Sequence, residues 1–210
     1  MDDVFQGFNN WLDIKTMPNG KRRVIKAAVT LFSRQGFDKT STSQIAQESQ
    51  MSQATIFKYF RSKKELLLFI IKPMIENILP TTQRILQDNH DGLISWVHFL
   101  VNDRYHFLSR NRDAAIILIS QVLIDEQVRG MLLDRVSYSK SLFAKKVWEN
   151  LLISDEIRDD LSMPDFIQLV LGQILFYFLQ SQRIEVIDDP RQINRDLQRI
   201  ERTIILAIRK

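Results

Sequence analysis

The chain has 210 residues, of which 45% are hydrophobic and 26% charged, and this balance excludes an extensively disordered protein. The absence of cysteine excludes disulfides, no apolar run is long enough to span a membrane, and the acidic Asp2 and Asp3 argue against a secretory signal, so we expect a cytoplasmic protein. The net charge of +4 is concentrated between Lys15 and Glu65, where eleven Lys or Arg residues stand against three acidic ones, a pattern typical of a nucleic-acid contact but also of a solvated basic surface.

The first 18 residues are predicted to form an N-terminal extension with a short amphipathic helix. Val4, Phe8, Trp11 and Leu12 fall on one stripe, and Pro18 ends it. This helix can cover an apolar patch of its own subunit or of a partner, or it can act as an arm near nucleic acid. The acidic residues of its front half argue against phosphate contact there, whereas Lys15 and residues 21–23 are placed to reach a backbone.

The next helix is predicted to begin at Asn19 and to end before Gly36. Apolar residues recur at three- and four-residue spacing from Val24 to Phe32, which is the period of a helix with one buried face. Gly36 stands where a helix commonly ends in a left-handed residue, and Phe37 can pack back on the same face.

Two short helices and the start of a long one follow. Residues 41–44 (Ser-Thr-Ser-Gln) and 62–65 (Ser-Lys-Lys-Glu) have the form of capping boxes, and Ser52 can cap the helix between them. The two short helices meet at a turn at Gln50-Met51, and with the preceding helix they form a helix-turn-helix. Residues 53–55 and Lys58 of the second short helix are small, polar or basic, which suits contacts with base edges and phosphates better than a core.

The segment from Ile25 to Leu67 resembles the DNA-binding domain of the TetR family of bacterial regulators. Two departures are Gln50, where the family usually has a glycine in the bend, and Phe57, where a tyrosine is more common. The backbone at Gln50 is therefore expected to be slightly reshaped or strained. The matching pieces are Ala27-Ala28, Leu31-Phe32, Gly36-Phe37, Thr40-Ser41-Thr42, Ile45-Ala46, Ser52, Thr55-Ile56-Phe57, Tyr59-Phe60, Ser62-Lys63 and Glu65-Leu66.

The resemblance implies which residues contact DNA. Residues 53–55 and Phe57 correspond to the part of the recognition helix that reads the major groove, where Gln53 can pair with adenine. Phosphate contacts are implied for Thr42, Lys58, Tyr59 and Lys63, although Tyr59 can instead pack beside Phe60. The complete predicted DNA-binding set is Thr42, Ser43, Ser52, Gln53, Ala54, Thr55, Phe57, Lys58, Tyr59 and Lys63.

The remaining sequence predicts an all-α protein of about nine helices, with a helix-turn-helix domain at residues 19–65 and a helical regulatory and dimerisation domain at residues 66–210. Pro73 and Pro80 predict a bend or break in the long helix that starts at Lys63. Further helices are expected at residues 93–108, 112–124, 126–152, 164–182 and 190–207.

The last two helices correspond to the pair that usually forms the dimer interface in the family. A two-fold axis would match the palindromic operator that such dimers bind, and an isologous homodimer is therefore expected. The predicted dimerisation residues are Phe166, Leu169, Gly172, Gln173, Phe176, Ile193, Leu197, Ile200 and Ile204.

The middle helices carry the residues that the resemblance implies for an effector pocket. An aromatic-rich lining suits a small, largely apolar or aromatic effector, but each residue can equally be ordinary core. The spacing of His98 and His106 does not suit a metal pair, so we expect no metal and no cofactor, and a hydrogen-bonded core histidine or an effector contact instead. The predicted ligand-binding residues are Trp96, Phe99, Leu100, Tyr105, Leu118, Phe143, Val147, Trp148, Phe176 and Tyr177.

These features predict a dimeric repressor that binds a double-stranded DNA operator and is released by a small molecule. The alternative within DNA binding is a regulator controlled by a protein partner, or an activator. A helical enzyme is disfavoured because the sequence has no catalytic triad order, metal cluster or Gly-rich phosphate loop.

Overall fold

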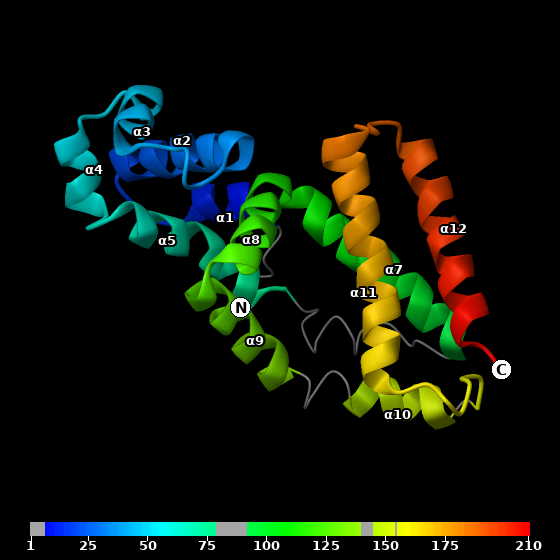
Figure 1. Cartoon of the computed structure of the whole chain (residues 1–210). Coiled ribbons are helices and arrows are strands. Elements are labelled where there is room, and N and C mark those ends of the chain that lie inside the picture. The colour runs from blue at the N-terminus through cyan, green and yellow to red at the C-terminus, as the bar shows by residue number, and fades with distance from the viewer. Residues whose placement is uncertain (1–6, 79–91, 140–144, 154) are drawn as a thin grey trace. The chain divides into compact units, whose positions relative to one another are not determined.

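The structure is a computed structural model that describes residues 7–78, 92–139, 145–153 and 155–210. Within these ranges it consists of helices and connecting turns, with no strand and a single isolated β-bridge between Ile157 and Arg209, so the predicted all-α class is confirmed (Figure 1). The helices are α1 (Phe8–Ile14), α2 (Asn19–Gln35), α3 (Thr42–Ser49), α4 (Gln53–Tyr59), α5 (Lys63–Glu76), α7 (Gly92–Arg110), α8 (Arg112–Ile124), α9 (Glu126–Ser139), α10 (Lys145–Ile153), α11 (Met163–Leu179), the π-helical turn η2 (Gln180–Ile184) and α12 (Pro190–Ile208).

The chain divides into two compact units. The N-terminal unit comprises residues 1–79 and 110–136, and the C-terminal unit comprises residues 80–109 and 137–210. The sequence predicted a division at residue 65, whereas the contacts group α5 and α8 with the helix-turn-helix, because α8 packs against both α2 and α5. None of the helices that the structure describes is both long and apolar enough to cross a membrane.

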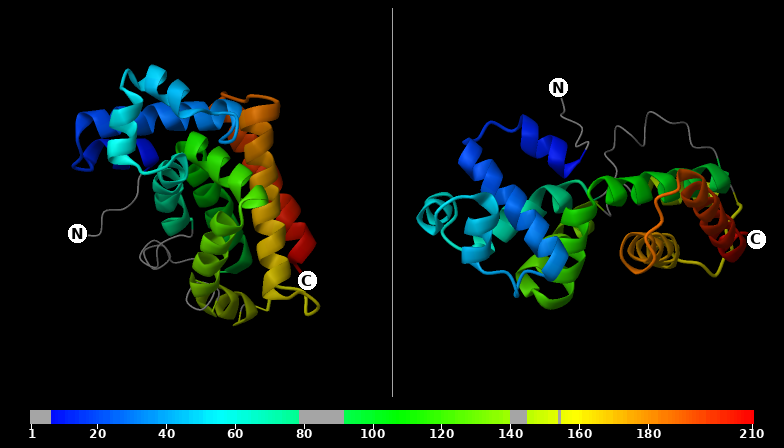
Figure 2. Two further views of the ribbon diagram at one scale, coloured as in Figure 1. Left: turned by 60° about the vertical axis from the view of Figure 1, so that its left-hand side comes forward. Right: turned by 90° about the horizontal axis from the view of Figure 1, so that it is seen from above.

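The core of the N-terminal unit is built by apolar side chains of α2, α3, α4, α5 and α8, and Figure 2 shows how these helices are arranged. Each short helix contributes one fully enclosed aliphatic side chain, Ile45 from α3 and Ile56 from α4, as the periodicity predicts. The ring of Phe60 packs edge-on against Phe69 of α5 at 5.5 Å. The short helices are thereby held by tertiary contacts, which isolated helices of this length require.

Helix α1 docks on this same unit. Phe8 and Leu12 are buried, the ring of Trp11 lies 5.7 Å from that of Phe69, and the backbone N–H of Phe8 donates to Asn111 Oδ1 at 2.6 Å. At the other end of α1, the Arg22 guanidinium donates to the carbonyls of residues 12, 13 and 15. Of the two predicted roles for the extension, this arrangement favours a cover over an apolar patch of its own chain.

The predicted helix starts are largely, but not entirely, reproduced. Ser41 and Gln44 form a complete capping box, with Gln44 Oε1 accepting from the Ser41 N–H at 2.8 Å. At the second predicted box, Ser62 caps Glu65, but the carboxylate of Glu65 accepts from the N–H of Arg61 instead. The long helix runs through Pro73 to Glu76, and the predicted effect of Pro80 lies outside the described residues.

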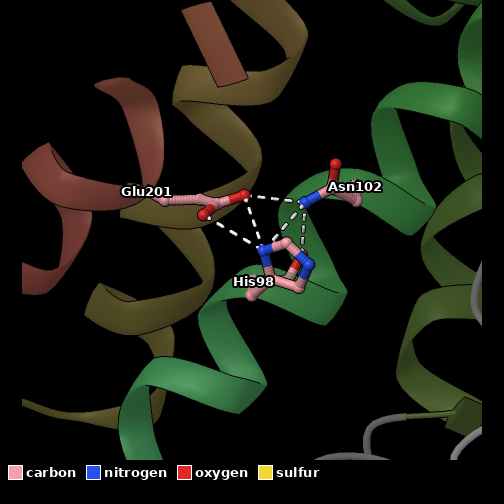
Figure 3. A network of polar contacts seen from close by, with 3 residues as sticks. All are labelled: His98, Asn102 and Glu201. Carbon is pink, nitrogen blue, oxygen red and sulfur yellow. Dashed lines mark hydrogen bonds and ion pairs between the residues drawn. The ribbon is translucent and has the colours of Figure 1, made fainter. Parts of the chain in front are cut away.

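In the C-terminal unit, α11 and α12 form an antiparallel pair (Figures 1 and 2). Helix α7 meets α12 through a polar cluster in which His98 Nδ1 and Asn102 Nδ2 both contact Glu201, at 3.1 and 2.7 Å (Figure 3). The predicted core position of His98 is not what the structure shows, because its side chain is 67% exposed, whereas the predicted effector contact is untested. Of the helix expected at residues 126–152, the structure describes α9 and α10, and residues 140–144 between them lie outside the described residues.

Candidate nucleic-acid interface

The turn between α3 and α4 has the conformation that glycine usually provides. Gln50 has φ 52° and ψ 42°, which is the left-handed region, so of the two expected outcomes the bend is not reshaped and the side chain occupies a strained backbone position. Its side chain is anchored, because Arg23 of α2 donates to Gln50 Oε1 at 2.8 Å. Sequence reasoning missed Arg23 in this role, since a contact between residues so far apart leaves no local pattern.

Helix α4 presents one face to the core and the opposite face to solvent. Ile56 is 2% exposed, whereas Phe57 is 48% exposed and residues 53, 54 and 58 are also exposed. The predicted base-reading residues therefore lie on the outer side of α4, except that Thr55 is half-buried and its hydroxyl lies 2.8 Å from the Ser52 hydroxyl. Ser52 itself caps α4 by accepting from the Thr55 N–H at 3.1 Å.

The side chain of Gln53 is oriented by the first helix of the motif. Thr42 Oγ1 donates to Gln53 Oε1 at 3.3 Å, and no described residue accepts a hydrogen bond from the Gln53 amide nitrogen. An amide held in this way still offers its NH₂ donors and a second lone pair on oxygen, which is the combination that adenine accepts in the major groove. Ser43 is exposed beside it and its hydroxyl contacts that of Ser41 at 2.8 Å.

The ammonium of Lys63 faces the protein. It donates to the carbonyls of Phe37 and Thr40 at 2.9 and 2.8 Å, and it lies 4.2 Å from the centroid of the Phe37 ring. An ammonium has three donors, so two are committed to bracing the segment that joins α2 to α3 and one remains for a phosphate. The predicted phosphate contact stays a prediction, with a structural role beside it.

Tyr59 is half-buried against the beginning of α2. A Cβ added to Gly20 would lie only 2.9 Å from the Tyr59 hydroxyl and 2.9 Å from Met51 Cε, so glycine permits this close approach. The packing role that the sequence left open for Tyr59 is thus present, and its predicted phosphate contact is untested.

Most of the basic residues between Lys15 and Glu65 contact other described residues. Lys26 pairs with Asp13 at 2.9 Å, and Lys64 pairs with Asp125 at the start of α9. Hydrogen bonds from these lysines lower the pKa of both carboxyl groups, so the two acids neutralise part of the local charge. The basic side chains that are exposed and have no partner among the described residues are Arg34, Lys39, Lys58 and Arg61.

The predicted effector residues separate between the two units. Trp96, Leu100, Tyr105 and Tyr177 are buried in the C-terminal unit, where the two tyrosine rings lie 5.3 Å apart. Phe99 and Trp148 are half-buried there, Leu118 is buried in the N-terminal unit and Phe176 is exposed. Phe143 and the side chain of Val147 lie outside the described residues.

Two polar contacts accompany the tyrosine pair. Tyr105 contacts the buried hydroxyl of Ser181 at 3.4 Å, and Tyr177 donates to Asp196 Oδ2 at 3.0 Å. Burial, and then the hydrogen bond to Asp196, raise the pKa of Tyr177 above its ordinary value. Sequence reasoning missed Ser181 and Asp196, because neither stands in a recognisable motif.

The predicted dimerisation residues differ in how far they are buried within their own chain. Phe166, Leu197 and Ile204 are buried within their own chain, so they pack inward rather than outward, whereas Ile193 and Ile200 are half-buried. The other four face or border an open groove of about 680 Å³ on the outer side of α11. Its lining includes Leu169, Gly172, Gln173 and Phe176.

Comparisons with known proteins find similarity to one family in the helix-turn-helix region. A model described as bacterial regulatory proteins, tetR family, matches residues 24–70. HbdR, an HTH-type transcriptional regulator of Aromatoleum sp. (strain CIB), is 30% identical over 108 residues, which are 50% of this chain and 45% of HbdR. YvdT, an uncharacterized HTH-type transcriptional regulator of Bacillus subtilis (strain 168), is 24% identical over 106 residues, or 50% of this chain and 54% of YvdT. This chain therefore spans about half the length of these curated relatives.

The solved structures agree on the fold. The transcriptional regulator FadR from Bacillus subtilis, in complex with stearoyl-CoA, superposes with a TM-score of 0.60 at 17% identity, over 87% of this chain and 94% of FadR. The likeness extends over both units, while the family model covers the helix-turn-helix and the first half of α5. Residues 24–70 are thus similar to the tetR family of bacterial regulatory proteins, about half of the chain is similar to helix-turn-helix transcriptional regulators, and the likeness to FadR shows the fold.

Proposed function

We propose that this protein is a dimeric repressor that binds a palindromic operator through α3 and α4. The observation that carries the proposal is the outer face of α4, where Gln53 is exposed and oriented by Thr42 while Ile56 anchors the helix in the core. A polar side chain in a fixed orientation on a rigid element is suited to reading base edges.

The regulatory part of the proposal is release by a small, largely apolar effector bound in the C-terminal unit. The buried pair of Tyr105 and Tyr177, with Ser181 and Asp196 at their hydroxyls, combines apolar walls with a few polar groups. Ligand pockets have this composition, and FadR of B. subtilis, which shares the fold, was solved with stearoyl-CoA. A long-chain acyl-CoA is therefore the first effector to test.

Fluorescence anisotropy with DNA from upstream of the gene itself, and with random DNA, tests the operator contact. Gln53→Ala is expected to weaken binding to the specific DNA by about 1–3 kcal/mol and to leave binding to random DNA nearly unchanged. Gln127→Ala, at an exposed position of α9, is the matched control and should change neither affinity. An unchanged ratio of specific to random affinity in Gln53→Ala would remove Gln53 from the reading residues.

The same assay tests release. Adding long-chain acyl-CoA is expected to lower the affinity for the specific DNA, and free coenzyme A is the control that lacks the apolar chain. If neither this effector nor other apolar small molecules change DNA binding, control by a protein partner becomes the better explanation.

A further inference from the structure

A continuous row of aromatic rings connects α1 to the end of α4. The row begins at Phe8, whose ring centroid lies 5.5 Å from that of Trp11. The ring of Trp11 lies 5.7 Å from that of Phe69 in α5, and Phe69 lies 5.5 Å from Phe60, which directly follows α4. Each separation is within the range at which aromatic rings attract one another. The aromatic row (Phe8, Trp11, Phe69 and Phe60) therefore links the first helix of the described chain to the helix that carries Gln53.

Phe60 fixes the end of α4. Its ring is buried, and its backbone N–H donates to the carbonyl of Ile56 at 2.9 Å, so that side chain and backbone are both held. Within α4 itself, Ile56 is the buried residue. A helix of two turns that is held in the core at these two points changes its direction when either point moves. The packing of Phe60 therefore bears on where the exposed face of α4 is directed.

The beginning of α1 is attached to the start of α8. Asn111 precedes α8 at the position from which such a side chain commonly caps its own helix, but here it does not cap α8. Its Oδ1 instead accepts the backbone N–H of Phe8 at 2.6 Å, in a buried environment. Arg110 and Asn111 are also the residues through which the chain enters the N-terminal unit from α7. The aromatic row is thus anchored at the entry of α8.

We infer that α1 is a positioning element for the DNA-reading helix and acts on α4 through the aromatic row. This inference rests on the proposed operator contact, and it gives the N-terminal extension a part in that contact without touching DNA. Close-packed side chains have little free space, so a displacement of one ring is passed to the next. Because Asn111 fixes the first ring of the row, the direction of α4 is set from the start of α8 as well as from the core contact of Ile56.

A simple cover over an apolar patch would not require aromatic rings at these places, since aliphatic side chains exclude water equally well. Two lysines favour rings in particular. Lys15 Nζ lies 4.5 Å from the ring centroid of Trp11, and Lys21 Nζ lies 4.8 Å from that of Phe60 and 5.0 Å from that of Phe69. An ammonium is attracted to the face of an aromatic ring but not to an aliphatic side chain. The two lysines therefore stabilise the rings in their present arrangement.

Substitutions of Trp11 separate positioning from covering. Trp11→Leu keeps an apolar side chain over Phe69 but removes the ring, whereas Trp11→Phe keeps a ring. Fluorescence anisotropy is expected to show that Trp11→Leu weakens binding to the specific DNA by about 3- to 10-fold and leaves binding to random DNA nearly unchanged. Trp11→Phe should recover most of the specific affinity. Val128→Ala is the matched control, because Val128 is buried in α9 of the same unit but lies outside the aromatic row.

A double-variant cycle tests the anchor at Asn111. Asn111→Ala removes the acceptor of the Phe8 N–H and is expected to lower the ratio of specific to random affinity, as Trp11→Leu does. Because both changes act through α1, Trp11→Leu/Asn111→Ala should lose no more of this ratio than the more severe single variant. A double variant whose loss is the product of the two single losses would show independent effects and overturn the inference.

Circular dichroism verifies that each variant folds, and Asn111→Ala decides the question if Trp11→Leu does not fold. An unchanged ratio of specific to random affinity in Trp11→Leu overturns the inference, as does an equal loss in Trp11→Phe or in Val128→Ala. Gln53→Ala is measured in the same series and reports on the operator contact itself. A lowered ratio in Gln53→Ala with an unchanged ratio in Trp11→Leu refutes the positioning role and leaves the operator contact intact.

Discussion

Replacement of Lys63 by methionine separates a bracing role from a DNA contact. Methionine keeps much of the apolar stem but cannot donate to the carbonyls of Phe37 and Thr40, which Lys63 now bonds at 2.9 and 2.8 Å. A hydrogen bond from a charged donor contributes about 1.5–3 kcal/mol when its partner is shielded. Since Lys63 is half-buried, we expect the two bonds together to contribute about 2 kcal/mol to the free energy of unfolding.

For a chain of this size, a loss of about 2 kcal/mol lowers Tm by about 4–8 °C. Thermal unfolding followed by circular dichroism measures the shift, with Lys58→Met as the control, because Lys58 is exposed and has no partner among the described residues. Lys58→Met should leave Tm unchanged and reduce the salt dependence of DNA binding by about one unit. If Lys63→Met melts like the wild type, the bracing interpretation is wrong.

Three further changes have defined outcomes. Arg22→Ala removes the donor that caps the last carbonyls of α1, so α1 should detach before the rest of the chain unfolds. The fluorescence of Trp11 should then shift to longer wavelength at a temperature well below the main unfolding transition, and a shift at the same temperature as that transition would contradict this. Asp125 has a lowered pKa in the folded protein, so its contribution to the free energy of unfolding is present above the ordinary pKa of 3.8 and is lost as the pH falls below that value. Asp125→Asn should therefore make the free energy of unfolding depend less on pH in the acid range, and an unchanged dependence would exclude this group. Leu197→Arg places a charge in a buried site and should abolish folding rather than release folded monomers, which size-exclusion chromatography of the soluble fraction distinguishes.

Local patterns predicted the helix-turn-helix because its structure depends on neighbours in sequence. Ser41 with Gln44, the cap at Ser52 and the apolar Ile45 and Ile56 all act within one helical turn, and the structure reproduces each of them. The bounds predicted for α8, residues 112–124, are also those observed. Strain at Gln50 could be expected because the resemblance places a glycine at this position, but the sequence did not decide between strain and a reshaped bend.

The side-chain contacts that local patterns did not predict depend on residues far away in the sequence. The charge of residues 15–65 gave no hint that Lys63 would turn to carbonyls of the segment between α2 and α3 or that Lys26 would pair with Asp13. The apolar stripe on α12 was likewise visible in the sequence, but packing against α7 and α11 decides which side of this helix faces inward. Leu197 was consequently expected at the partner surface, whereas Leu206 is the exposed one.

The bond between Arg23 and Gln50 has a consequence for how the motif can evolve. A glycine at residue 50 would adopt the left-handed turn without strain but would offer no side chain to α2, whereas Gln50 accepts the strain and gains an anchor at 2.8 Å. The two solutions are therefore alternatives, and each makes a different residue acceptable at position 23. Among homologues, an arginine at this position should accompany a polar residue in the bend and be free to drift where the bend is glycine.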